Sequence, residues 1–127
     1  MQILLDTQVY LWALESSPRL TAAAVDFIQQ ADQVYVSAAS VWEACVKIAI
    51  GKLDADPAHL LASIENSGFV ELKIEARHAV VVAGLPLWHR DPFDRLLIAQ
   101  ALDGPFVLLT ADSTLTRYSE LVQLINV

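Results

Sequence analysis

Five acidic residues, drawn from four distant parts of the chain, stand where strands end or helices begin: Asp6, Glu43, Asp91, Asp94 and Asp112. Carboxylates that share a pocket raise one another's pKa, and burial adds to the cost of keeping them charged. Hard divalent cations relieve this repulsion, and oxygen atoms are the ligands that Mg²⁺ and Mn²⁺ prefer. If the four segments meet, the chemistry they support is activation of a water molecule by a bound metal ion.

Each acid also fits a purely structural role. Asp6 and Asp91 have the position of an N-cap, and Asp112 lies in a sequence typical of a turn. Glu43 follows a serine by three residues, as in a capping box, and precedes Lys47 by four, as in a helical ion pair. Glu43 is, however, the only acid in a mostly apolar helix, where a carboxylate needs a partner. Asp91 has the best structural explanation of the five.

The elements that would bring these acids together alternate between short apolar strands and helices. We expect strands at 3–5, 33–36, 69–72, 106–109 and 122–127, and helices at 9–14, 21–31, 39–50, 57–66, 75–83 and 92–102. This alternation predicts an α/β layer sandwich with a parallel sheet covered on both faces. Sites in such folds form beyond the carboxyl ends of the strands. Asp6 and Asp112 follow strands there, and Glu43 and Asp94 begin helices that can reach the same edge.

The overall charge of the chain bears on which ligands it can take. The formal net charge is −7, whereas nucleic-acid-binding proteins usually carry a basic surface. Without the five acids the chain would carry only −2, and bound divalent ions would reverse the sign of the pocket. The acidity is therefore evidence against a general nucleic-acid-binding surface, but not against a metal-loaded site that binds one.

Length and composition indicate a single folded domain, which we take to span residues 1–127, with 55% hydrophobic residues. The single cysteine, Cys45, excludes an internal disulfide and a cysteine zinc site. No apolar run approaches the roughly 18–20 residues that cross a bilayer, and the first residues do not read as a signal peptide. We therefore expect a cytoplasmic protein without membrane contact.

Several stretches together resemble a known family. They are Leu4–Thr7, Val41–Ala44, Gly51–Leu53, His89–Ala101 and Val107–Asp112, and the stretch from His89 is the most specific. In order and spacing they are similar to PIN-domain ribonucleases, and among these to the VapC toxins of bacterial toxin–antitoxin pairs. The resemblance implies a three-layer α/β/α sandwich with a mostly parallel central sheet. It also implies a Mg²⁺- or Mn²⁺-dependent ribonuclease that cuts single-stranded RNA.

The resemblance further implies an acidic site of Asp6, Glu43, Asp94 and Asp112, a homodimer, and a small antitoxin whose tail blocks the pocket. We expect Asp6 and Asp94 to contact the metal directly, and leave open whether Asp91 does so instead of Asp94. Glu43 and Asp112 would bind a second ion or act through waters.

Polar residues near the acids have supporting roles in this hypothesis. Three hydroxyl groups would orient carboxylates or waters: those of Thr7, Thr110 and Ser113. Three cations are candidate phosphate contacts, with ordinary surface charge or an internal ion pair as the alternative: Lys47, Arg90 and Arg95. His89 could stack on a base or bind phosphate, but we favour its interpretation as a solvent-exposed loop histidine. Apolar residues beyond the needs of a modest core indicate a protein interface: Trp12, Leu87, Trp88 and Tyr118.

Two alternatives belong to other functional classes. A phosphoryl-transfer domain of the aspartyl-nucleophile kind would carry a second acid two residues after Asp6, but that position is Gln8. A receiver domain would carry adjacent acids after an early strand, and these are absent. A PIN-like module used only for binding would be expected to lack an acid, yet all four are present.

Overall fold

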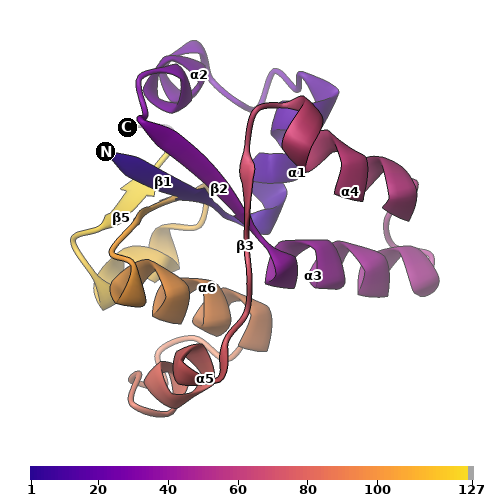
Figure 1. Cartoon of the computed structure of the whole chain (residues 1–127). Coiled ribbons are helices and arrows are strands. Elements are labelled where there is room, and N and C mark those ends of the chain that lie inside the picture. The colour runs from indigo at the N-terminus through magenta and orange to yellow at the C-terminus, as the bar shows by residue number, and fades with distance from the viewer. Residues whose placement is uncertain (126–127) are drawn as a thin grey trace.

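The central sheet has five strands in the order β3-β2-β1-β4-β5, and every neighbouring pair is parallel. The computed structural model shown in Figure 1 describes residues 1–125. The strands are β1 (Gln2–Leu5), β2 (Gln33–Ser37), β3 (Val70–Leu72), β4 (Val107–Thr110) and β5 (Val122–Leu124). The prediction of an α/β fold with a parallel sheet is confirmed, and within the described residues the sheet contains no antiparallel pair.

Both faces of the sheet are apolar, because neither face is left to solvent. Side chains alternate along a strand, so Ile3 and Leu5 join one buried cluster while Leu4 joins another on the opposite face. All three are completely buried. Each such side chain contributes roughly 1.5–3 kcal/mol on leaving water. The short strands are therefore held mainly by what covers them.

Helices cover the sheet in two layers (Figure 1). The first face packs against α1 (Thr7–Glu15), α2 (Ala22–Gln29) and α4 (Pro57–Asn66). The second packs against α6 (Pro92–Asp103) and the 3₁₀ helix η1 (Ser113–Tyr118), with α5 (Ala76–Ala83) lying against α6. The remaining helix, α3 (Ala38–Ala49), follows β2 directly. Three layers result, as the resemblance implied.

Three features at the ends of elements complete the comparison with the prediction. The last strand ends at Leu124, before the predicted end at 127, and residues 126–127 lie outside the described part of the chain. The 3₁₀ helix after β4 was not predicted. No helix within residues 1–125 is both long and apolar enough to cross a membrane.

Candidate active site

The carboxyl edge of the sheet holds a cavity of about 230 Å³ into which all five predicted acids are brought. Asp6 directly follows β1, and Asp112 follows β4 by two residues. Glu43 comes from α3, the helix after β2, so three neighbouring strands deliver a carboxylate to one place. The start of α6 supplies the other two acids. The lining residues are Asp6, Thr7, Gln8, Leu11, Glu43, Lys47, Asp91, Asp94 and Asp112.

Asp6 is buried and makes two hydrogen bonds. Its Oδ1 accepts a hydrogen bond from the backbone N–H of Val9 at 2.8 Å, which makes it the N-cap of α1. Its Oδ2 accepts a short hydrogen bond from the hydroxyl of Thr110. Burial raises the pKa of Asp6 to about 6, and the charges of Asp94 and Glu43 add to the rise against the two hydrogen bonds. The capping role therefore does not replace a role in the cavity.

Glu43 has one carboxylate oxygen that no protein group in the described part of the chain satisfies. Its side chain is 9% exposed, and Oε2 pairs with Lys47 Nζ at 3.1 Å. Its Oε1 is buried and makes no hydrogen bond, the only such side-chain atom within residues 1–125. A buried polar atom without a partner costs about 1–3 kcal/mol, and more when charged. The helical ion pair therefore satisfies only one of the two oxygens.

Asp91 and Asp94 share the first turn of α6 but differ in their contacts. Asp91 is the N-cap: its Oδ1 accepts from the backbone N–H of Phe93 at 2.9 Å and of Asp94 at 3.1 Å. Asp94 Oδ2 lies 2.7 Å from His89 Nε2. Burial raises the pKa of Asp94, and the neighbouring charges of Asp91 and Glu43 raise it further, against the contact with His89.

His89 belongs to the site, and its interpretation as an exposed loop histidine is wrong. Its side chain is only 21% exposed, and its Nε2 contacts Asp94 Oδ2. Ligand atoms of His89, Asp94 and Asp112 all lie within 4.8 Å of one another. Asp112 is the N-cap of η1, and its Oδ1 accepts from Thr114 N at 3.0 Å and Thr114 Oγ1 at 2.7 Å. The sequence signal was the position of His89 five residues before Asp94.

The three predicted hydroxyl groups are placed differently. Thr110 touches Asp6 directly, as expected of an orienting group. Thr7 lines the cavity, but its hydroxyl donates to Ser40 Oγ at 3.0 Å. Ser113 is exposed and does not line the cavity; Thr114 makes the contacts to Asp112 instead.

The three predicted phosphate contacts also differ in their position relative to the cavity. Lys47 lines the cavity beside Glu43, whereas Arg90 is exposed and outside the lining. Arg95 is 8% exposed, and its guanidinium donates to main-chain carbonyls at the end of α5 and in the loop that precedes α6, those of Val82, Leu85, Pro86 and His89. Its expected role as a phosphate contact does not fit this geometry, because the carbonyls already hold the guanidinium. The alternative of an internal ion pair describes Arg95 better, except that main-chain carbonyls take the place of an acidic side chain.

The donor set suits a divalent cation. Five acids crowd one cavity, the carboxyls of Asp6 and Asp94 have raised pKa values, and a buried oxygen of Glu43 has no partner within residues 1–125. A divalent ion would neutralise the charges of these acids, Asp6 and Asp94 included, and would give the unpaired oxygen of Glu43 a partner. Oxygen ligands of this kind match Mg²⁺ and Mn²⁺.

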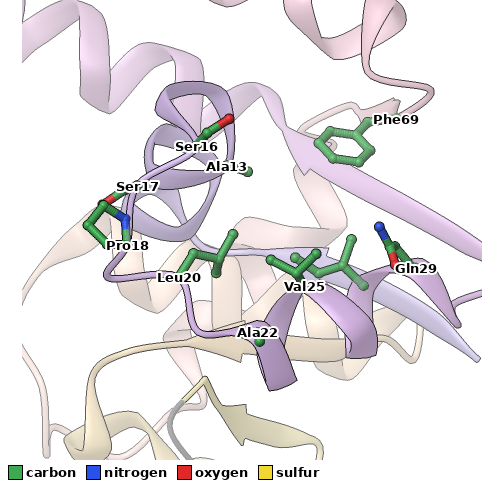
Figure 2. Close-up of a pocket in the computed structure, with 10 residues that line it drawn as sticks. Ala13, Ser16, Ser17, Pro18, Leu20, Ala22, Val25, Gln29 and Phe69 are labelled. Atoms are coloured by element: carbon green, nitrogen blue, oxygen red, sulfur yellow. The ribbon is translucent and has the colours of Figure 1, made fainter.

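A larger cavity, of about 580 Å³, has no such chemistry. It lies between the end of α1, α2 and Phe69, which is across the cavity from Leu20 and Val25 (Figure 2). No acidic, basic or histidine side chain lines it. It can take an apolar group, but it cannot hold a metal ion or activate water.

Solved structures with the same fold were found at low sequence identity. VapBC2 from Rickettsia felis, bound to a DNA fragment from its promoter, matches with a TM-score of 0.72 and 15% identity, over 98% of this chain and 97% of that chain. DNA-bound VapBC from Salmonella typhimurium matches with a TM-score of 0.66 and 15% identity, over 98% of this chain and 96% of that chain. FitAcB from Neisseria gonorrhoeae matches with a TM-score of 0.63 and 18% identity, over 96% of this chain and 95% of that chain. No relative was found among curated proteins.

Family membership rests on the sequence itself. The profile of the PIN domain matches residues 3–121, a span that includes all five acids of the cavity. The match covers nearly the whole chain, and the structural likeness agrees with it from end to end. The chain therefore belongs to the PIN domain family, a family of nucleases.

Proposed function

We propose that this chain is a metal-dependent endoribonuclease for single-stranded RNA and the toxin of a toxin–antitoxin pair, acting in the cytoplasm. The observation that carries the proposal is the buried, unpartnered Oε1 of Glu43 in a cavity shared with Asp6, Asp94 and Asp112. The VapBC assemblies from Rickettsia felis and Salmonella typhimurium, which share the fold, support the biological setting.

The acids divide into direct ligands and supporting groups. We assign Asp6 and Asp94 as direct ligands, because Asp6 is buried, Asp94 is half-buried, and burial raises the pKa of each carboxyl. Asp94 is favoured over Asp91 as the direct ligand because a ligand atom of Asp94 lies within 4.8 Å of ligand atoms of His89 and Asp112. Glu43 and Asp112 hold a second ion or act through waters.

A bound Mg²⁺ or Mn²⁺ supplies Lewis acidity, lowering the pKa of a water and neutralising charge on the phosphate. The chain's own residues position the reaction. Thr110 and the N-terminus of α1 fix the Asp6 carboxylate from two sides. Lys47, half exposed beside the cavity, is placed to meet a phosphate oxygen. Because water attacks and not a ribose hydroxyl, the products carry a 5′-phosphate and a 3′-hydroxyl.

Two apolar surfaces support protein partners. Trp42 of α3 is 57% exposed and borders a groove of about 220 Å³ shared with α5 and the start of α6. We assign this surface to a homodimer, since an exposed apolar groove of this kind is typical of an interface. Leu87 and Trp88, on the loop before α6, are also exposed. For the antitoxin, the acidic cavity favours a peptide that carries arginine.

Cleavage of a single-stranded RNA in Mg²⁺ tests the proposal. Asp6→Asn keeps the size and the cap of α1 but removes a charge, so we expect cleavage to fall by at least about 100-fold, as for loss of a group that stabilises the transition state. Asp54→Asn, at an exposed position outside the cavity, is the matched control and should cleave normally. Full activity of Asp6→Asn would reject the site. A DNA strand of the same sequence tests the preference for RNA.

A binding-only PIN module is the second candidate, and metal titration separates the two. Calorimetry with Mn²⁺ should show heat that Asp94→Asn abolishes, because Asp94 is assigned as a direct ligand. Absence of such heat, together with absence of cleavage, would favour the binding module. Heat without cleavage of any RNA or DNA would favour a phosphoryl-transfer domain with another substrate.

A further inference from the structure

We propose that His89 is a nitrogen ligand of the metal site, which makes the site prefer first-row transition ions such as Mn²⁺ and Co²⁺ to Mg²⁺. This inference rests on the proposed function and adds one residue to its metal centre. It identifies a role for a loop histidine that lies outside the four acids.

The first step is the position of the imidazole. Its Nε2 lies 2.7 Å from Asp94 Oδ2, and a ligand atom of Asp112 completes a trio within 4.8 Å. Two atoms that each lie about 2.1 Å from one ion are at most about 4.2 Å apart. The three side chains therefore need only small rotations, on the order of 1 Å or less, to share an ion.

The second step is the hydrogen bonding on the other side of the ring. His89 Nδ1 lies 3.5 Å from Thr114 Oγ1, and that hydroxyl donates to Asp112 Oδ1 at 2.7 Å. Thr114 Oγ1 therefore keeps a lone pair for a proton on Nδ1. Without an ion, the 2.7 Å contact with the carboxylate of Asp94 places a proton on Nε2. A cation that displaces this proton takes the lone pair of Nε2 while a proton on Nδ1 faces Thr114, and metal-bound histidines generally donate from their other nitrogen in this way.

The third step is that the loop is built to hold His89 in place. The backbone N–H of His89 donates to Tyr118 Oη at 2.8 Å, and its carbonyl accepts from Arg95 Nη1 at 3.2 Å. Both anchors also bond the carbonyl of Pro86, at 2.8 Å each. A surface loop without function does not need a buried arginine to fix it, because such loops tolerate motion. The anchors fit a residue whose placement matters.

The chemical consequence is metal preference. A nitrogen donor favours first-row transition ions, with affinity rising from Mn²⁺ to Co²⁺ and Ni²⁺, while Mg²⁺ prefers oxygen alone. Loss of an outer-shell partner alone costs about 10- to 100-fold in metal affinity. Removal of His89 should therefore cost at least about tenfold for Co²⁺ and leave the weaker Mg²⁺ affinity nearly unchanged.

Pulsed electron paramagnetic resonance of the Mn²⁺-loaded protein gives the decisive test, because it detects nitrogen bound to the ion. We expect ¹⁴N coupling in the wild type, its loss in His89→Gln, and its retention in His59→Gln, a histidine that is exposed on α4 and does not line the cavity. Calorimetry with Co²⁺ and Mg²⁺ on the same three proteins measures the change in preference.

The outcomes separate this inference from the proposed function. Mn²⁺ that binds the wild type without ¹⁴N coupling, or coupling that survives in His89→Gln, overturns the role of His89 and leaves the acidic nuclease site standing. Wild-type protein that binds no Mn²⁺ at all overturns both. Because the wild-type spectrum alone decides the first point, the test does not depend on correct folding of a variant.

Discussion

Without metal, the carboxylate of Asp6 should weaken the fold, and Asp6→Asn should therefore stabilise the metal-free protein at pH 8. The side chain is 7% exposed, and burial raises its pKa from 3.8 to about 6. A tenfold change in proton affinity is worth about 1.4 kcal/mol, so this rise corresponds to about 3 kcal/mol. The charged form of Asp6 is therefore costly in the folded cavity when no cation is present.

The sign of the pH dependence follows from which state binds protons. Between pH 3.8 and about 6, folded Asp6 holds a proton that the unfolded chain has lost. Stability from this group is thus complete below pH 3.8 and is lost as the pH rises through about 6. Asp6→Asn removes this dependence. The variant also turns an amide toward Thr110, which offsets its gain by about 1 kcal/mol at every pH.

Thermal unfolding followed by circular dichroism, in EDTA, measures the effect. We expect Asp6→Asn to melt about 5–10 °C above the wild type at pH 8, since 1 kcal/mol shifts a domain of this size by a few degrees. The difference should shrink as the pH falls to 4. With Mn²⁺ at about 100 times its Kd, the wild type should gain about 2.7 kcal/mol and the variant much less. A difference in melting temperature that stays constant between pH 4 and pH 8 would refute the reasoning.

Three further predictions concern single side chains. Glu43→Gln should lower RNA cleavage by at least about 100-fold while the far-ultraviolet spectrum stays unchanged, because the shape is kept and a charge is lost. Arg95→Met should destabilise the fold by about 3 kcal/mol in urea unfolding, because its carbonyl partners lose their donors; a loss below about 1 kcal/mol would contradict the anchoring role. Arg77 lowers the pKa of Asp103. The stability that this pair adds is therefore present above pH 3.8 and is lost as the pH falls through the lower pKa of the folded state. Arg77→Gln should make acid unfolding begin at a higher pH, and an unchanged midpoint of acid unfolding would contradict this.

Much of the fold could be predicted because local signals agree with one another. Apolar runs stop at a polar residue where each strand ends, and Asp6, Thr21, Asp56 and Asp91 cap the helices that follow. The carboxyl edge of a parallel sheet then brings the acids together. The 3₁₀ helix after β4 escaped prediction because its sequence is rich in hydroxyl residues and lacks helical periodicity.

The placement of Arg95 and His89 could not be predicted from local patterns. An arginine in the first turns of a helix is normally exposed, and nothing in its neighbours shows that a distant loop will supply carbonyls. The burial of Arg95 depends on how residues 82–89 fold back. His89 lies at the end of the same segment and contacts Asp94, so one unpredicted tertiary feature explains both errors.

An acid that caps a helix can also bind a metal ion, so the two roles between which the sequence could not decide do not exclude each other. A carboxylate has two oxygens, and a cap uses one. Asp91 and Asp112 each make their capping contacts through Oδ1, and within residues 1–125 no hydrogen bond reaches their Oδ2 atoms. Capping therefore orients each acid in advance, and a bound ion need not order it, which reduces the entropy lost on binding.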